Sequence, residues 1–302
     1  MTTFRVTQTM LANSSLRSLQ AGLGRLASVQ EQLTTGRVLN RPSDSPTDTT
    51  NAMRIRSSLT QAAQHARNAD DAEGRLALID TTLGSMTTQV RRARELVLQG
   101  ANAASGPAAR EALATEIDQL RESLLSAANT RYLERPVFGG ITAGGKAYTD
   151  GSDPAVPAGT WVGTPGVVSR QVGTDVTVRV DLAGPEVFGS GQDSLFATLE
   201  AASTAVIGGD PAGMDAALTE LAAHLDRIGS SQAVIGARQA QVDRAVVATG
   251  DAQLALTTRL SDVENVDLPR ALVDLKLQEV AYQAALGATA RATQPSLLDF
   301  LR

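Results

Sequence analysis

One short segment of the chain has the spacing of a phosphate-binding loop. GITAGGK, residues 140–146, fits the pattern G-x-x-x-x-G-K, in which backbone amides cradle phosphates and the lysine reaches the terminal ones. That chemistry also requires a hydroxyl directly after the lysine to hold magnesium, and a helix whose amino end faces the phosphate. Ala147 stands at the hydroxyl position, and the following AYTDGSDPAVPAG is too rich in Gly and Pro for a helix. We therefore interpret the segment as a flexible entry to a β-rich region.

The two histidines are the next candidates for acid–base or metal chemistry. His65 and His224 lie in helical segments far apart in the sequence, and the chain contains no cysteine and no H-E-x-x-H motif. Neither a zinc site nor a histidine-assisted nucleophile is therefore predicted. Asp150 and Asp153 do not have the spacing of an EF-hand calcium loop. We expect both histidines at the surface or at the edge of a helix seam, and the sequence predicts no metal and no cofactor.

Asp70 and Asp71 form an acidic pair within a helical segment. Neighbouring residues on a helix point to different faces, so these two carboxylates would not converge on one reacting atom. We expect them to be solvated and to pair locally with Arg67 or Arg75. With the phosphate-loop pattern also incomplete, the sequence specifies no catalytic residue and no enzyme.

The composition favours thin helix-on-helix packing. Hydrophobic residues make up 42% of the 302 residues but aromatic residues only 3%, whereas aromatic side chains dominate most compact cores and ligand pockets. The net charge of −5, with no basic run, argues against nucleic acid as a partner. The opening MTTFRVTQTM does not resemble a signal peptide, and no apolar run is long enough to span a bilayer.

The amino-terminal half has the apolar spacing of helices. Apolar residues recur every three or four positions from Leu16, stop at the loop GRVLNRPSDSPTD (36–48), and resume from Ile55 to Val97. Gly106-Pro107 ends that helix and starts another, because proline is tolerated at the first helical position. From about residue 136 to 194, Gly and Pro accumulate and β-branched residues alternate with polar ones around Val178. This region is predicted to be a small β-rich insert with Trp161 in its core.

The carboxyl-terminal third is the most regular segment. Apolar and glutamine residues keep a strict four-three spacing from Met214 to Val263, which corresponds to a helix of roughly 75 Å at 1.5 Å per residue. The pattern breaks at ENVDLP (264–269) and resumes to Thr289, with Asp267 as the cap of the new helix. The sequence therefore predicts a mainly α fold with a small β-rich insert, in which the N- and C-terminal arms form an elongated helical rod.

The seams at the two ends pose the functional question. A thin two-helix unit cannot bury apolar surface on both sides, and isolated helices are marginal in water. The chain nevertheless closes on QPSLLDFLR (294–302), with four large apolar residues in its last turn. We expect many copies packed side by side to bury the apolar surface that one copy leaves exposed, so that residues 294–302 contact a neighbouring subunit. The candidate assembly residues of these terminal seams are Leu16, Leu19, Leu23, Leu26, Leu33, Leu268, Leu272, Leu275, Tyr282, Leu286, Leu297, Leu298, Phe300 and Leu301.

Three segments resemble the flagellin family. RNADDAEGRLALIDTTLGSMTTQVRRARELVLQGAN (67–102) resembles the amino-terminal helix of that family, and QEQLTTGRVLNRPSDSPT (30–47) resembles its turn between the inner and outer helical domains. SDVENVDLPRALVDLKLQEVAYQAAL (261–286) is similar to its returning helix. The order and spacing match over nearly all of both arms. The resemblance implies a flagellin-like fold and a structural role in the bacterial flagellum.

Further segments are similar to the family members that join the hook to the filament. These are GPEVFGSGQDSLFATLEAA (184–202), IGARQAQVDRA (235–245) and QPSLLDFL (294–301), and they imply a junction ring on which flagellin assembles. NTRYLERPVFGG (129–140) resembles filament flagellin instead, so filament flagellin is an alternative. A cytoplasmic helical signalling or scaffolding rod is a further alternative, since it would share long heptads and few aromatics. That rod would need neither a β-rich insert nor two unpartnered terminal seams.

The resemblance also implies a division of the chain and a set of partners. Residues 1–40 and 265–302 match terminal helices that are disordered in the monomer and line the inner tube after assembly. Residues 41–135 and 195–264 match a helical rod domain, and 136–194 an inserted outer domain. The implied partners are further copies of the chain, hook-associated protein 1 as the first junction protein, flagellin, an export chaperone and the flagellar export apparatus. Export through the flagellar channel without a cleaved signal peptide implies an extracellular location.

Overall fold

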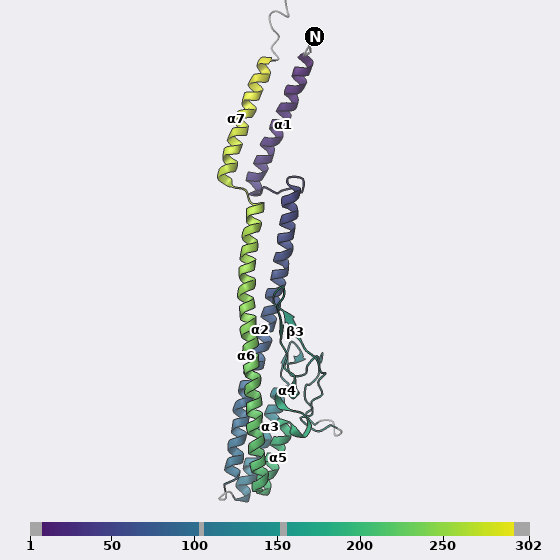
Figure 1. Ribbon diagram of the computed structural model, residues 1–302, viewed down its shortest axis with the longest axis vertical. Coiled ribbons are helices and arrows are strands. Elements are labelled where there is room, and N and C mark those ends of the chain that lie inside the picture. Colours follow the sequence, from purple (N-terminus) through teal and green to yellow (C-terminus); the bar gives the residue numbers. More distant parts are fainter. Residues whose placement is uncertain (1–7, 103–105, 152–155, 293–302) are drawn as a thin grey trace, which may run out of the picture. The chain divides into compact units, whose positions relative to one another are not determined.

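The computed structural model describes residues 8–102, 106–151 and 156–292 (Figure 1). Helices dominate the described residues and two small antiparallel sheets accompany them, so the predicted mainly α fold with a small β-rich insert is confirmed. The helices are α1 (Gln8–Thr35), α2 (Pro46–Gly100), α3 (Pro107–Ala128), α4 (Gly184–Phe188), a 3-10 turn η1 (Gly191–Asp193), α5 (Leu195–Gly208), α6 (Pro211–Glu264) and α7 (Leu268–Ala292). The strands are β1 (Arg131–Tyr132), β2 (Arg135–Pro136), β3 (Ser169–Gln171) and β4 (Thr177–Arg179), and they pair as two hairpins, β1 with β2 and β3 with β4.

The chain divides into two compact units. The terminal unit comprises the residues up to Thr60 and those from Gln253, and it contains α1, α7 and the adjoining ends of α2 and α6. The central unit, Gln61–Ala252, contains the rest of α2 and α6 together with α3, α4, α5 and the strands. The boundary falls inside the two long helices and not at a loop. The three-part division expected from the sequence stays a prediction.

Local side-chain chemistry sets several helix starts. Ahead of α2, the hydroxyl of Ser45 accepts a hydrogen bond from the Asp48 N–H at 3.3 Å, which caps one of the orphan amides, and it donates one to the Asp48 carboxylate at 2.7 Å. Ahead of α7, Asp267 Oδ1 accepts from the Arg270 N–H at 3.3 Å. Asp267 therefore caps α7 as predicted, and the break between α6 and α7 lies at the predicted position.

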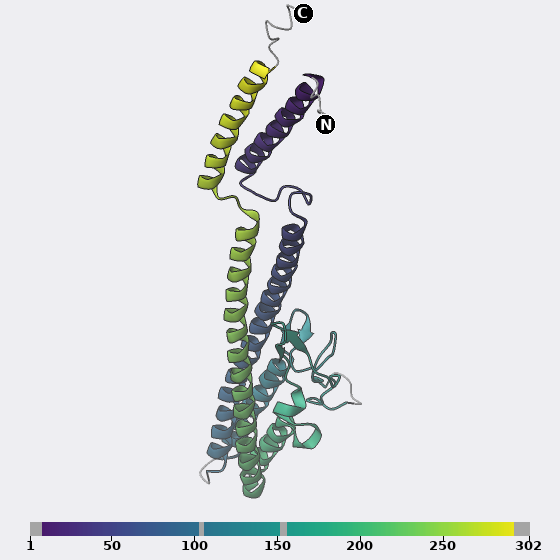
Figure 2. The same ribbon diagram turned by 45° about the horizontal axis from the view of Figure 1, so that its top comes forward.

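The core of the central unit follows the heptad pattern of α6. Figures 1 and 2 show α2, α3, α5 and α6 side by side in this unit. Buried α6 residues include Ala217, His224 and Ser231. In addition, one heptad position is buried in every repeat, because a repeat of seven residues keeps the same stripe of the helix facing its neighbours. The residues at this position are Met214, Leu221, Ile228, Ile235, Val242 and Thr249. The predicted apolar face of α2 is also fully buried, through Leu76, Ile79, Leu83, Met86, Val90, Ala93 and Val97.

The described residues of the insert share this core. Phe138, Tyr148 and Phe188 from the insert pack with Phe196 of α5, edge to face, with ring centroids 5.1 Å apart for Phe138–Phe188 and 5.1 Å for Tyr148–Phe196. All four rings belong to the same buried cluster as the α2 and α6 stripes. Trp161, expected in the core, is only half-buried at the edge of this cluster, and its indole N–H donates to the Phe138 carbonyl at 3.0 Å.

Charged side chains attach the insert to the long helices. The Asp181 carboxylate is fully buried, and it accepts two hydrogen bonds from the Arg179 guanidinium at 3.0 and 3.1 Å and one from the Val168 N–H at 2.8 Å. The carbonyl of the same residue accepts from Arg238 of α6 at 2.7 Å. Arg170 of β3 pairs with Asp71 of α2 at 2.7 Å. A buried carboxylate is tolerated because its lone pairs are satisfied in this way.

The turn of the β1–β2 hairpin is strained. Leu133 and Glu134 have φ angles of 46° and 63°, and within the described residues they are the non-glycine positions with positive φ. A two-residue hairpin turn of type I′ has positive φ at both positions and strongly favours Asn-Gly there. A branched side chain such as that of Leu133 costs on the order of 1–3 kcal/mol in this conformation. Leu133 nonetheless points into solvent, with 74% of its surface exposed.

We predict that truncating the α6 stripe destabilises the protein, whereas truncating an exposed leucine of the same helix does not. Leu221→Ala removes a side chain that is 0% exposed and should lower the free energy of unfolding by about 2–5 kcal/mol. Leu254→Ala, at a residue that is 69% exposed, should change the monomer by about 0.5 kcal/mol or less. Urea unfolding followed by circular dichroism measures both. Equal losses would show that the α6 stripe is not the core.

Candidate assembly surfaces

The segment with the phosphate-loop spacing does not build a phosphate site. The next described helix after Lys146 is α4, which begins only at Gly184. The Ala147 N–H is buried and donates to Asn129 Oδ1 at 2.8 Å. Lys146 forms an ion pair with Asp150. Both the amide and the cation that a phosphate would need are therefore engaged in holding the insert together.

The expected surface or seam-edge position is wrong for one of the two histidines. His65 is half-buried, with Nδ1 3.4 Å from the Gln171 carbonyl oxygen. His224 is 1% exposed inside the α5–α6 packing, with Nε2 3.2 Å from Thr198 Oγ1. Burial, and secondarily the nearby Arg227 cation, lower the pKa of His224 to about 4. His224 is therefore a neutral core residue at physiological pH.

Of the acidic pair of α2, Asp71 holds the insert by a contact that is distant in sequence. Asp71 contacts Arg170 of β3, whereas Arg67 or Arg75 had been expected. Arg67 donates to the Gln64 amide oxygen at 2.6 Å, and Arg75 is 3% exposed, which lowers its pKa. Asp70 is exposed. The contact with Arg170 spans 99 positions of sequence, so no local pattern indicated it.

Neither a metal centre nor a membrane span is found in the described part of the chain. Its residues contain no group of three or more His, Cys, Asp or Glu side chains placed to hold a metal ion. Among the described helices, none combines the length and apolar character needed to cross a bilayer. The candidate functional features that remain are surfaces that could contact other protein chains.

α1 and α7 pack side by side in the terminal unit (Figures 1 and 2). The Tyr282 ring lies over Gly22, where a Cβ would be 3.4 Å from the ring, and Arg25 donates to the Gln278 side chain at 3.4 Å. The residues that turn toward the partner helix keep three-four spacing, as two packed helices require. On α1 they are Ser15, Leu19, Gly22, Leu26, Val29 and Leu33, and on α7 they are Ala271, Leu275, Gln278, Tyr282, Ala285 and Thr289.

The predicted assembly residues therefore fall into three groups. One group is half-buried between the two helices: Leu19, Leu26, Leu33, Leu275 and Tyr282. A second group is exposed, with 44–56% of each side chain open: Leu16, Leu23, Leu268, Leu272 and Leu286. The third group, Leu297, Leu298, Phe300 and Leu301, lies outside the described residues. The assembly role of the whole set stays a prediction.

A larger apolar surface on α7 was missed by heptad counting. Val273, Leu277 and Val280 are 67%, 65% and 63% exposed, and they lie outside the three-four pattern that was followed from Leu268. The signal was present in the composition, because apolar residues occur on more than one face of this helix. When a helix is apolar over more than one face and packs against a single partner helix, part of its apolar surface stays exposed to solvent, which marks an interaction surface.

The joint between helices in the terminal unit is built by the two connecting segments themselves. The Val38 N–H donates to the Glu264 carbonyl at 2.8 Å and the Val266 N–H donates to the Gly36 carbonyl at 3.0 Å. The Glu264 carboxylate, on a residue only 6% exposed, lies 2.7 Å from the Arg56 guanidinium. The predicted turn after α1 and the predicted break after α6 thus meet in space.

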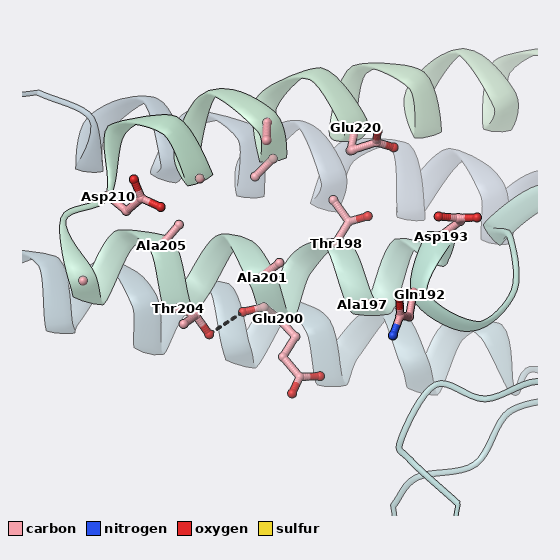
Figure 3. A pocket seen from close by; sticks show the side chains of 14 residues that line it. Gln192, Asp193, Ala197, Thr198, Glu200, Ala201, Thr204, Ala205, Asp210 and Glu220 are labelled. Carbon is pink, nitrogen blue, oxygen red and sulfur yellow. Dashed lines mark hydrogen bonds between the residues drawn. The ribbon is translucent and has the colours of Figure 1, made fainter.

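A groove lies between α5 and α6 in the central unit (Figure 3). Its volume is about 910 Å³, and much of its wall is made of small side chains such as Ala201 and Ala205. Asp193 and Glu220 lie at one end and Asp210 at the other (Figure 3). No sequence pattern indicates this groove, because it depends on how two helices pack.

Two family models match the chain. The bacterial flagellin N-terminal helical region matches residues 6–142, and the bacterial flagellin C-terminal helical region matches residues 215–301. The chain belongs to the flagellin family. Residues 143–214, which contain β3, β4, α4 and α5, lie outside both matched regions.

Individual flagellin-family relatives match along nearly the whole chain. Flagellar hook-associated protein 3 of Escherichia coli K12 is 23% identical over 94% of this chain and 95% of its own length. Flagellin FlaB2 of Treponema pallidum is 24% identical over 90% of this chain and 91% of its own. The solved structure of a flagellar hook-associated protein from Vibrio parahaemolyticus superposes with a TM-score of 0.67 at 22% identity, covering 74% of this chain and 100% of that one, which shows a shared fold.

We predict that the buried histidine makes stability depend on pH. The pKa of His224 is about 4 in the folded protein and about 6.5 in the unfolded chain, so below pH 6.5 the unfolded state binds the proton first. Stability is therefore full above pH 6.5 and falls as the pH drops toward 4. Between pH 7 and pH 5 the protein should lose about 2 kcal/mol through this group. Urea unfolding at the two pH values measures the loss.

The matched variant for this prediction is His224→Gln, which retains a polar side chain and cannot take up a proton in this range. Carboxylates titrate in both proteins, so the difference between them isolates the histidine. An identical pH dependence in the two proteins would contradict the assignment of a depressed pKa to His224.

Proposed function

We propose that this protein is a structural component of the bacterial flagellum that forms the junction ring between hook and filament, on which flagellin assembles. The observation that carries the proposal is the match to hook-associated protein 3 of Escherichia coli over 94% of this chain and 95% of that protein. Such a match spans both arms and the region between them, including the part outside the flagellin family models. The role is structural and not catalytic.

The terminal unit gives the physical reason for assembly. The common buried cluster runs from Ala69 to Ala245 and lies entirely in the central unit. The terminal unit instead consists largely of two paired helices with apolar side chains still exposed, such as Leu272, Val273 and Leu277. Burying apolar surface is favourable by about 25 cal/mol per Å², so packing copies against one another would stabilise helices that are marginal alone.

The proposed partners follow from this role. They are further copies of the chain, hook-associated protein 1 on the hook side, flagellin on the filament side, and an export chaperone with the export apparatus before assembly. The chaperone would cover the exposed apolar faces of α7 that assembly later buries. An extracellular location on the flagellum, reached without a cleaved signal peptide, is part of the proposal.

A second candidate function is filament flagellin itself. It rests on the likeness to flagellin FlaB2 of Treponema pallidum, at 24% identity over 90% of the chain. The match to hook-associated protein 3 covers more of the chain, at 94%, so the junction role is the favoured one. The two roles share the same packing of terminal helices, and they differ in where the subunit stands in the flagellum. The cytoplasmic signalling or scaffolding rod has no such support.

We predict that trypsin cuts the free monomer first at its two ends. Arg17, Arg25 and Arg270 lie on helices that pack against one partner only, whereas arginines such as Arg75 and Arg238 lie in the central packing. Local unfolding is easiest where few apolar contacts must break. Mass spectrometry of a time course should show loss of residues 1–40 and 265–302 before any central cut. If both ends resisted trypsin as well as the centre does, the result would contradict the proposal that the ends stay disordered until assembly.

We predict that deleting the gene leaves bare hooks on the cell and a separate flagellin in the medium. The filament protein would still be exported but would have no junction on which to polymerise. Electron microscopy of the cell surface and immunoblotting of the medium measure the two results. Bare hooks without flagellin anywhere would identify this chain as the filament protein, and normal filaments would overturn both functions.

A further inference from the structure

The tip of the β1–β2 hairpin displays a leucine in a conformation that leucine disfavours. Leu133, with its φ of 46°, is the most exposed of the described large apolar side chains, at 74%. Strained backbone positions cluster at functional and binding sites, so an observed outlier at an exposed position motivates a hypothesis of function. Nothing in the described fold uses this side chain, because three quarters of it faces solvent.

The surroundings of Leu133 are basic on balance. Arg131 and Arg135 flank the turn and are both exposed, against the one carboxylate of Glu134. The Arg131 guanidinium lies 3.9 Å from the Glu134 carboxylate, which leaves the charge of Arg135 in excess at the tip. The tip therefore combines one apolar side chain with a net positive charge, and its best complement is an apolar hollow with an acidic rim.

The α5–α6 groove has that character. Ala201, Ala205 and Ala217 are among the small residues that form its walls, and its volume of about 910 Å³ exceeds what one leucine side chain fills. Asp193, Asp210 and Glu220 stand around it, and no lysine, arginine or histidine is among its lining residues (Figure 3). The groove and the hairpin tip thus match in shape and in sign of charge.

The hairpin of one chain cannot reach the groove of the same chain. Tyr132 of the hairpin packs on Gly74 of α2, where a Cβ would be 2.8 Å from the Tyr132 hydroxyl. Val206 of α5, beside the groove, packs on Gly100 at the far end of the same helix, where a Cβ would be 3.1 Å from it. From position 74 to position 100 the helix rises about 39 Å at 1.5 Å per residue.

We propose that the β1–β2 hairpin tip of one copy docks into the α5–α6 groove of a second copy, with Leu133 as the inserted side chain. Because the two surfaces differ, the contact is head-to-tail, and a head-to-tail contact repeats from subunit to subunit to give a ring or a helical array. This inference rests on the proposed function, since both require copies of the chain to assemble. Besides the contacts proposed for the terminal helices, it gives a second contact between subunits, made by the central unit.

The first test uses two substitutions that both relieve the strained turn. Leu133→Asn places at this position a residue that adopts positive φ readily and removes the apolar side chain. Glu134→Gly relieves the neighbouring position and keeps Leu133. Neither variant should lower the melting temperature. Recovery with sheared flagella should fall about ten-fold or more for Leu133→Asn, because a buried leucine contributes that much to association, and should be kept for Glu134→Gly.

A second pair of substitutions tests the groove. Ala201→Trp fills the hollow from its exposed wall and should reduce recovery with flagella to the same extent as Leu133→Asn. Ala223→Trp places the same side chain at an exposed position of α6 outside the groove and should leave recovery unchanged. Recovery of Leu133→Asn and Ala201→Trp at the level of the unaltered protein would overturn the proposal.

Cysteine cross-linking tests the contact directly. The chain contains no cysteine, so only the introduced thiols can react with the cross-linker. The full-length double variant Leu133→Cys/Ala201→Cys, assembled in cells and treated in sheared flagella with a short bis-maleimide, should yield a ladder of multimers. The pair Leu133→Cys/Ala223→Cys is the matched control and should remain monomeric.

The outcomes separate this inference from the function on which it rests. Chain present in the flagellar fraction without a ladder would overturn the hairpin–groove contact and leave the junction role intact. Dimers from Leu133→Cys alone would mean a tip-to-tip contact, and an adduct with flagellin would mean a different occupant; both would overturn the proposal. Absence of the chain from the flagellar fraction would overturn the proposed function and this inference together.

Discussion

The buried stripe of α6 is the constraint on which the rest of the central unit depends. A repeat of seven keeps the same heptad position turned inward from Met214 to Thr249, and its apolar side chains belong to one buried cluster with those of α2. The buried side chains in the described part of the insert, its aromatic rings included, belong to this cluster. The insert side chains are buried only when the insert is held against the helices. The Asp71–Arg170 and Asp181–Arg238 contacts hold it there.

The terminal unit obeys the same helical pattern with the opposite result. Its helices bury one stripe against each other, and no third layer formed by the described residues covers the remaining apolar faces. Two paired helices are too thin to form a closed core. The same feature that makes this unit marginal in one copy makes it suitable for assembly, because the uncovered side chains gain free energy only when other subunits surround them.

Two kinds of surface are therefore available for contacts between subunits. The apolar faces of α7 are broad and need only a close-packed neighbour, as in a tube of helices. The hairpin tip and the α5–α6 groove are small and complementary in shape, and they carry opposite charge. Such surfaces are typical of contacts that set register and choice of partner. The groove lies mostly in the part of the chain outside the flagellin family models. A subunit that stands between two different structures needs both adhesion and a fixed register.

The sequence by itself determined the helices, their breaks and the absence of a phosphate site. Apolar periodicity, Asp267 as a cap and Ala147 in place of a hydroxyl are local features, and local chemistry decides them. Tertiary structure decided what covers each helical face. It buried His224 under α5, joined Asp71 to Arg170 across 99 positions, and formed the groove. The physical reason is that periodicity specifies which side of a helix is apolar, whereas the partner that lies against that side is set by packing between segments distant in sequence.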